Sequence, residues 1–313
     1  MAVAPELRQY LEGANAAGVP RLDDMSIDDV RAVSEAFVNA SAMDAEPVDV
    51  VEDRHLPGPA GDIAVRVYDP DPGATSPVVA YFHGGGWVMM GLDTHDRVCR
   101  RLANAAHAVV VSVDYRLAPE HRFPAALDDC MAVTHWLTDH AEELAGDPTR
   151  IAVAGDSAGG NLAAATALAS RSDGPGLAAQ VLVYPATDAA CETTSYRTNG
   201  EGFLLTTSAM RWFWDQYLGP HGDPGDRYAS MLRADDLNGA PPALIMTAEH
   251  DVLRDEGEAY ADRLRAAGVD VTSLCYPGMV HGFLMMDALT PTAVTAMAEI
   301  AGFLERVLTA APR

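Results

Sequence analysis

The chain of 313 residues is 49% hydrophobic and 21% charged, a composition typical of a globular protein that buries a sizeable core. Its 45 acidic residues outnumber 21 arginines, lysine is absent, and the net charge is -24. So acidic a surface repels phosphate backbones and anionic lipid, which argues against nucleic-acid and membrane-surface binding. Adaptation to high salt and a codon bias toward Arg and Asp both stay open as explanations of this charge.

Targeting signals are not evident in the sequence. The first residues carry charges and lack the apolar core of a secretory signal, and no apolar run is long enough to span a bilayer. Four cysteines are widely spaced and form no Cys-x-x-Cys motif: Cys99, Cys130, Cys191 and Cys275. Free buried thiols in a reducing compartment are the expected state of such cysteines. We therefore expect a cytoplasmic protein with no stable membrane insertion.

The first segment has a helical pattern over residues 5–45, and Ser26 followed by Asp29 resembles a capping box. Because this segment precedes the first strand, we expect residues 1–45 to form cap helices. Eight apolar segments then have the length and composition of strands: 48–52, 63–68, 78–82, 109–113, 151–154, 180–184, 243–247 and 271–276.

Helical patterns separate most of these strands, over residues 95–106, 124–143, 162–169, 254–267 and 291–309. The first two strands, joined by a Pro/Gly turn, predict an antiparallel start. The later alternation predicts an α/β fold with a mostly parallel eight-stranded sheet flanked by helices. Ligands of such a sheet bind beyond the C-terminal ends of its strands.

An insertion at 188–225 interrupts this alternation and divides the expected core into residues 46–187 and 226–313. It is rich in aromatic residues, and residues 206–218 have a helical pattern. Two interpretations stay open: simple packing against the core, or a cap that roofs an apolar pocket. For the second we expect four residues to contact substrate: Trp87, Phe203, Leu204 and Trp212.

The motif Gly-x-Ser-x-Gly, centred on Ser157, lies between a predicted buried strand and an Ala-rich helix. The bare pattern arises easily by chance, but this setting predicts a tight turn with Ser157 at its apex. Small neighbours permit the cramped backbone that such a turn requires. The turn would project the hydroxyl beyond the sheet, where a nucleophile is needed.

A nucleophilic serine also needs a base and an acid that orients the base. Asp251 follows one strand, with Glu249 as its nearest rival and Asp255 as a more distant one. His281 follows the last strand in a glycine-containing loop. The order Ser157, Asp251, His281, each after a strand, is that of one known fold.

Three successive glycines close an early strand, in His83-Gly84-Gly85-Gly86-Trp87. Backbone N–H groups of such a loop can face a ligand without hindrance from a Cβ atom, and with the N–H of Ala158 they would form an oxyanion hole. A flexible loop is the plain alternative. A phosphate cradle is another, but the Lys and Ser/Thr of a P-loop are missing.

Together with segments 114–121, 251–257 and 281–283, these motifs resemble the hormone-sensitive lipase family of α/β-hydrolases, which includes the bacterial family IV esterases. The resemblance implies an α/β-hydrolase fold with a helical cap. It implies a triad of Ser157, Asp251 and His281. It also implies oxyanion donors, which we list with Gly84 as the weakest candidate: Gly84, Gly85, Gly86 and Ala158.

We therefore expect a carboxylic-ester hydrolase that needs no cofactor and acts on small esters of short- to medium-chain acids. An amidase, lactonase or deacetylase would use the same residues, and a non-catalytic receptor of the same fold is a further alternative. Activity should fall on acidification, because the base must be neutral. A homodimer stays open as an assembly.

Two smaller features have plainer interpretations. Asp93, His95 and Asp96 could suggest a metal site, but their position at a helix start favours capping and packing, so we expect no metal. Segment 114–121 has no catalytic role that its residues reveal. We expect an ion pair between Arg116 and Glu120 that braces its turn.

Overall fold

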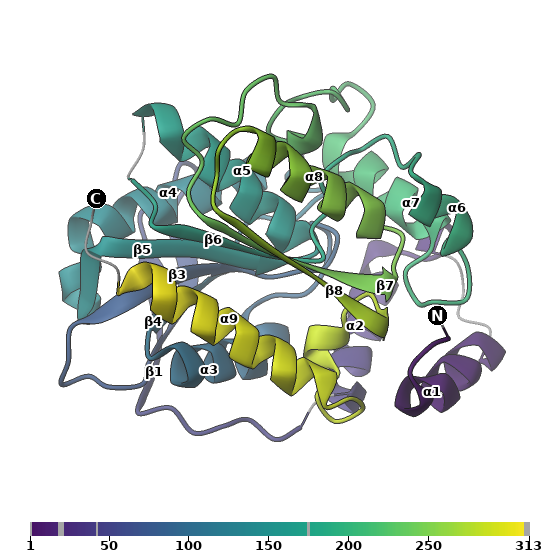
Figure 1. Cartoon of the computed structure of the whole chain (residues 1–313), viewed down its shortest axis with the longest axis horizontal. Helices are drawn as coiled ribbons and strands as arrows, with labels where there is room; N and C mark the ends of the chain where they lie inside the picture. Colours follow the sequence, from purple (N-terminus) through teal and green to yellow (C-terminus); the bar gives the residue numbers. More distant parts are fainter. Residues whose placement is uncertain (1, 18–21, 42, 174–175, 310–313) are drawn as a thin grey trace.

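The computed structural model describes residues 2–17, 22–41, 43–173 and 176–309. A single sheet crosses it (Figure 1), with strands β1 (Val50–Leu56), β2 (Ile63–Asp69), β3 (Ser76–Phe82), β4 (Val109–Val113), β5 (Gly146–Asp156), β6 (Ala179–Val183), β7 (Ala243–His250) and β8 (Val271–Val280). Their order is β1-β2-β4-β3-β5-β6-β7-β8. β1 with β2 and β2 with β4 pair antiparallel, and all later pairs are parallel. The predicted eight-stranded, mostly parallel sheet is confirmed.

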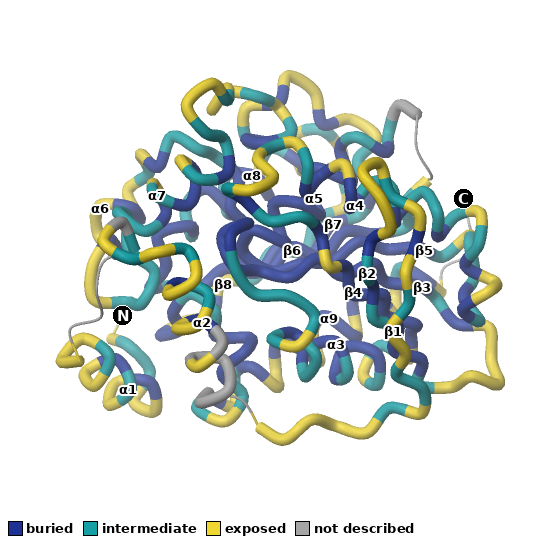
Figure 2. Tube along the Cα trace, turned by 180° about the vertical axis from the view of Figure 1, so that it is seen from behind, coloured by how far each residue is buried: buried dark blue, intermediate teal, exposed yellow. Residues whose placement is uncertain are grey.

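Burial differs between the central strands and β1, which the sequence predicted with shifted bounds. Every residue of β4 is buried, since helices cover both faces of the parallel part of the sheet. β1 lies at the sheet edge, and its residues are exposed or half-buried except Leu56, which is buried (Figure 2). It begins at Val50 and ends at Leu56, later than the predicted segment 48–52. Its exposed residues Glu52 and Asp53 interrupt the apolar run on which the predicted bounds rested.

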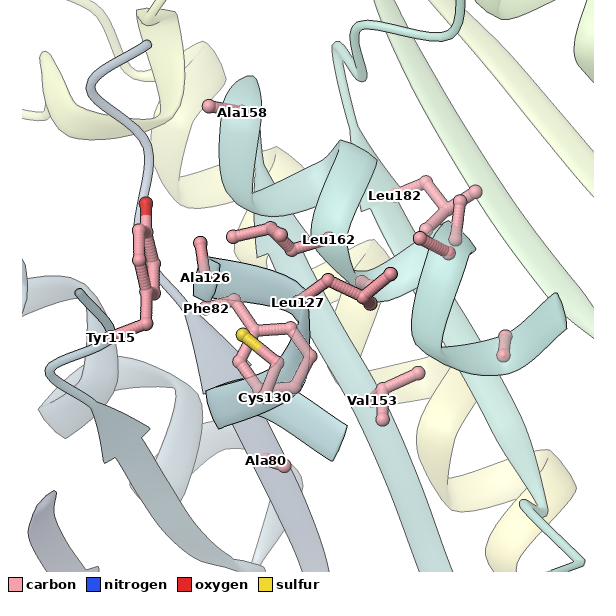
Figure 3. Packing of buried hydrophobic residues seen from close by; sticks show 14 of the residues in the cluster. Ala80, Phe82, Tyr115, Ala126, Leu127, Cys130, Val153, Ala158, Leu162 and Leu182 are labelled. Atoms are coloured by element: carbon pink, nitrogen blue, oxygen red, sulfur yellow. The ribbon is translucent and has the colours of Figure 1, made fainter. Parts of the chain in front are cut away.

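Helices cover the two faces separately (Figure 1). α3 (Leu92–Ala106) and α9 (Thr292–Leu308) pack on one face, and α4 (Ala125–His140), α5 (Ala158–Asp173) and α8 (Arg254–Ala266) pack on the other. Figure 3 shows the second layer, where Phe82 and Val153 of the sheet meet Leu162 of α5. Each fully buried side chain of this size contributes about 1.5–3 kcal/mol. This core holds the ends of β3 and β5 rigidly beneath the site.

The register of the last two strands, β7 and β8, determines the relative position of the residues that follow them. His250 of β7 pairs with Val280 of β8, across an irregularity that follows Ala248. Both strands run further than predicted, to His250 and Val280. The residues that follow the paired ends, Asp251 and His281, are consequently neighbours although they lie 30 positions apart.

Four helices gather where β7 and β8 end (Figure 1): α1 (Pro5–Ala16), α2 (Ile27–Ser41), α6 (Thr194–Thr198) and α7 (Thr207–Leu218). Of the predicted helical segment 5–45, residues 18–21 and 42 lie outside the described residues. At the start of α2, Ser26 accepts a hydrogen bond from the N–H of Asp29 at 3.1 Å and donates one to its carboxylate at 2.7 Å. The expected capping interaction is therefore present.

The cysteines differ in exposure. Cys99, Cys130 and Cys191 are buried, as expected, whereas Cys275 is exposed. It lies on β8, the other edge strand of the sheet, where one side chain in two faces outward. Within the described ranges, no helix has the length and apolar character needed to cross a membrane.

Candidate active site

Ser157 occupies a sharp turn between β5 and α5. Its φ of 55° is in the left-handed region, which is strained for a residue with a side chain. The turn is held by the Ser157 N–H, which donates to the Val183 carbonyl at 2.9 Å. A Cβ at Gly159 would lie 1.9 Å from the Phe82 carbonyl oxygen, so only glycine fits there. The close approach of α5 to β3 thus depends on that glycine.

Ser157, His281 and Asp251 form one line of hydrogen bonds. His281 Nε2 lies 2.9 Å from Ser157 Oγ, and His281 Nδ1 lies 2.7 Å from Asp251 Oδ2. The Asp251 carboxylate is fully buried, and its other oxygen accepts the N–H of Leu253 at 3.0 Å. This arrangement can take a proton from the hydroxyl and stabilise the resulting imidazolium.

The two rival acids have other partners. Glu249 accepts the N–H of Gly278 at 2.8 Å, and Asp255 accepts the N–H of Ser195 at 2.7 Å. The neighbouring histidine also turns elsewhere, since the ring of His250 stacks on Phe203 with centroids 4.8 Å apart. Of the three acids weighed, Asp251 is the one that the structure places against His281.

The glycine loop lies across the turn from Ser157. Gly85, Gly86 and Ala158 line the cavity above the serine. Gly86 has a φ of 60°, and a Cβ there would lie 2.2 Å from Phe213. Gly84 differs, because its N–H already donates to Asp156 Oδ1 at 3.0 Å. Its amide therefore holds the loop in place and does not face the cavity.

A buried carboxylate beneath the loop was missed by the sequence analysis. Asp156 Oδ1 accepts the Tyr81 hydroxyl at 2.8 Å and lies 3.1 Å from His95 Nε2. Burial raises the pKa of Asp156, but His95 and the Tyr81 hydroxyl outweigh it and hold the pKa below its usual range. A polar residue ending an otherwise apolar strand was the signal that could have revealed it.

His83, the first residue of the loop motif, is also fully buried. Burial lowers its pKa to about 3, so the ring is neutral at physiological pH. Its Nδ1 lies 2.7 Å from the Gly84 carbonyl, and its ring stacks on Tyr115 at 4.2 Å. A neutral, stacked imidazole fixes the base of the loop without adding charge near the serine.

The three residues considered for a metal have separate partners. Asp93 pairs with Arg66 at 2.9 Å, and Asp96 pairs with Arg100 at 2.7 Å. His95 approaches Asp156 instead. Asp93 and Asp96 therefore take part in ion pairs and only His95 is packed in the core, while Thr94 makes the helix-start hydrogen bonds, with Gly91.

A cavity of about 1000 Å³ opens above Ser157. Its walls come from α1, α2, the glycine loop, the insertion and the turn after β8. Of the four residues expected to contact substrate, Trp87, Leu204 and Trp212 line it. Phe203 is not among the lining residues, because its ring is stacked on His250. Five methionines, which the sequence analysis did not single out, also line it: Met25, Met89, Met90, Met210 and Met285.

The expected ion pair between Arg116 and Glu120 is wrong. Arg116 instead binds Asp129 of α4, at 2.8 Å, and the same carboxylate accepts the Arg116 N–H at 3.0 Å. Asp129 is almost fully buried, so it binds the nearest guanidinium more strongly than an exposed partner would. Glu120 pairs with Arg31 of α2, at 2.8 Å.

Comparison with known proteins agrees with the fold and the site geometry described above. A family model described as alpha/beta hydrolase fold matches residues 79–285, more than half of the chain. The carboxylic ester hydrolase LipN of Mycobacterium tuberculosis is 43% identical over 91% of this chain and 78% of its own length. The ethyl acetate hydrolase of Pseudomonas putida is 37% identical over 94% of this chain and 95% of its own length.

A solved structure agrees over the whole length. The crystal structure of a thermostable esterase from Pseudomonas putida superposes with a TM-score of 0.95 at 40% identity, and the match covers 99% of both chains. The chain therefore belongs to the α/β-hydrolase family, in the hormone-sensitive lipase branch that its motifs resemble.

Proposed function

We propose that this carboxylic ester hydrolase cleaves esters of short- to medium-chain acids through an acyl-enzyme intermediate on Ser157. The observation that carries the proposal is the line from Ser157 Oγ to His281 and Asp251, with contacts of 2.9 Å and 2.7 Å, at the floor of the cavity. A serine is a weak nucleophile without such a base. The line supplies the base and the acid that orients it.

The reaction follows from this geometry. Ser157 Oγ attacks the ester carbonyl while its proton passes to His281 Nε2, and Asp251 holds the Nδ1–H. The tetrahedral intermediate collapses, and the alcohol leaves with the proton from His281. Water then attacks the acyl-enzyme and gives a proton to the same nitrogen. His281 returns this proton to Ser157 Oγ as the acid leaves, which regenerates the free serine.

Negative charge that forms on the carbonyl oxygen needs donors. We assign this role to the N–H groups of Gly85, Gly86 and Ala158, which line the cavity beside Ser157. Ala158 is the first residue of α5, where N–H groups are unpaired and the helix dipole favours an anion. Each such donor contributes about 3 kcal/mol to stabilising the transition state.

The preference for short to medium acyl chains rests on enclosure. Ser157 is 8% exposed and lies within the cavity, under α2 and α7. A dissolved ester of modest size fits such a space, whereas a lipid surface cannot approach the hydroxyl. The name of one relative, ethyl acetate hydrolase, points to a short acyl group for that protein and supports the same preference here.

The test is a chromogenic ester panel of increasing acyl length, with an anilide and a lactone included to separate amidase and lactonase activity. Wild type should hydrolyse the short esters fastest, and Ser157→Ala should lose that activity. A serine-directed phosphonate should add its mass to wild type and not to Ser157→Ala. His281→Gln should also inactivate the enzyme, while its matched control, His250→Gln, should not.

A preference for long-chain emulsions contradicts the proposed chain length. Full activity of Ser157→Ala contradicts the mechanism itself.

A further inference from the structure

Helix α2 forms one wall of the cavity above Ser157. Val30, Val33 and Ser34 of this helix line the cavity. The helix lies outside the sheet, so its position depends on side-chain contacts with the core rather than on strand pairing. Whatever anchors α2 therefore helps to decide which acyl groups the cavity accepts.

Arg31, on the same helix, makes four hydrogen bonds to the core. Its Nε donates to the Val88 carbonyl at 2.9 Å, and its Nη2 donates to the Ala118 carbonyl at 3.4 Å. The two Nη groups also bind both carboxylate oxygens of Glu120, at 3.0 Å and 2.8 Å. A guanidinium is suited to this fork of acceptors, and a lysine ammonium is not.

The acceptors of these bonds lie directly behind the glycine loop. Val88 follows Trp87, and its N–H donates to the Gly85 carbonyl at 3.1 Å. Ala118 donates its own N–H to the Trp87 carbonyl at 2.8 Å. Arg31 thus joins the cavity wall to the segment that carries the proposed oxyanion donors.

Segment 114–121, for which the sequence revealed no role, contacts the loop at both ends. The Tyr115 hydroxyl donates to the His83 carbonyl at 2.7 Å, and Ala118 binds Trp87. Glu120, from the same segment, forms an ion pair with Arg31 of α2. The segment therefore supports the loop from behind and connects it to the cap.

The ion pair alone would be a weak anchor. Glu120 is 53% exposed, and exposed pairs contribute little because water and salt screen them. Arg31 is only 28% exposed, and its two backbone acceptors are part of the loop support. The hydrogen bond from Arg31 lowers the pKa of Glu120, so the carboxylate stays charged to a lower pH than a free glutamate would. The four bonds together make a defined joint.

We propose that Arg31 is a positioning residue that sets acyl-chain specificity. By tying α2 to Glu120 and to the segment behind the glycine loop, it holds the wall formed by Val30, Val33 and Ser34 at a width that suits short acyl chains. Without these hydrogen bonds, α2 can move away from the cavity, and substrates with longer acyl chains can bind. The inference rests on the ester hydrolysis proposed above.

The experiment compares kcat/KM for p-nitrophenyl octanoate with kcat/KM for p-nitrophenyl butyrate in each enzyme. This ratio is independent of the fraction of active protein, so partial unfolding cannot imitate the effect. In Arg31→Gln the ratio should rise about 10-fold, as expected when several hydrogen bonds to one anchor are lost. Arg31→Lys and Glu120→Gln should show smaller rises, since each keeps part of the joint.

The matched control is Arg211→Gln, which removes a charge from α7 at an exposed position away from the cavity and should leave the ratio unchanged. An unchanged ratio in Arg31→Gln and Arg31→Lys, or a shift toward butyrate, overturns the inference while ester hydrolysis stands. If Arg31→Gln does not fold, the Lys and Glu120→Gln variants decide by the same ratio. Wild type that hydrolyses neither ester overturns the proposed function and this inference together.

Discussion

Replacement of Asp251 by Asn should inactivate the enzyme by fixing the wrong tautomer of His281. One Asp251 oxygen accepts the Leu253 N–H at 3.0 Å, and the other faces His281 Nδ1 at 2.7 Å. An Asn oxygen is needed toward Leu253, so the amide NH2 must face Nδ1 and donate to it. The proton of His281 then sits on Nε2, where it blocks acceptance of the Ser157 proton.

The expected loss in kcat is about 10⁴-fold, or about 5.5 kcal/mol, the size that this exchange has in Ser-His-Asp proteases. Glu249→Gln is the matched control, because Glu249 lies two residues earlier and accepts the Gly278 N–H instead. Its kcat should stay within about 3-fold of wild type. Steady-state hydrolysis of a short p-nitrophenyl ester measures both, with thermal melts to check that each variant is folded.

Two results would refute this reasoning. One is an Asp251→Asn enzyme that keeps more than about one hundredth of wild-type kcat while folded, since no tautomer block would then exist. The other is a comparable loss in Glu249→Gln, which would transfer the role of the acid to that residue.

Three further predictions concern the loop and the core. Gly86→Ala should reduce kcat at least about 100-fold, because its Cβ would lie 2.2 Å from Phe213 and a φ of 60° is strained for alanine; an ester assay showing wild-type kcat would contradict it. Asp156→Asn should lower kcat about 10-fold with little change in KM, since Gly84 loses a charged acceptor; a change in KM alone would argue against loop positioning. Burial raises the pKa of Glu256 well above its ordinary value of 4.5, so the folded state keeps a proton that the unfolded state releases, and the free energy of unfolding falls as pH rises above that value. Glu256→Gln should flatten this dependence in urea titrations at pH 5 and pH 8, and an equally steep fall in the variant would exclude Glu256 as its source.

The sequence predicted the sheet from its apolar strand segments, and it predicted the proximity of Ser157, Asp251 and His281 because each of these residues follows a strand. Parallel strands place their C-terminal ends at one edge, so residues after strands converge there. The pairing of His250 with Val280 then brings Asp251 beside His281. A short apolar strand is a local property of the sequence, and the order of the strands is given by the chain itself. Both can be identified from the sequence alone.

Other features depend on which way a side chain turns, and the sequence could not specify them. Arg31 and Glu120 lie 89 positions apart, so nothing local predicted their contact over the nearer Arg116. Whether the Gly84 N–H faces the cavity or donates to Asp156 depends on where the buried Asp156 carboxylate points. Phe203 is an aromatic residue of the kind that lines apolar pockets, but in the structure its ring stacks on His250.

Tryptophan rings lie at the contact between the glycine loop and α7, so intrinsic fluorescence can monitor this contact. Trp87 is fully buried, stacks on Tyr217 at 4.4 Å and lies 4.3 Å from Trp214, with Trp212 on the cavity wall nearby. Three of the four tryptophans of the chain are thus placed at one functional boundary. Intrinsic fluorescence of the unlabelled protein should therefore report on ligand entry and on movement of α7, with Trp136 of α4 contributing a background.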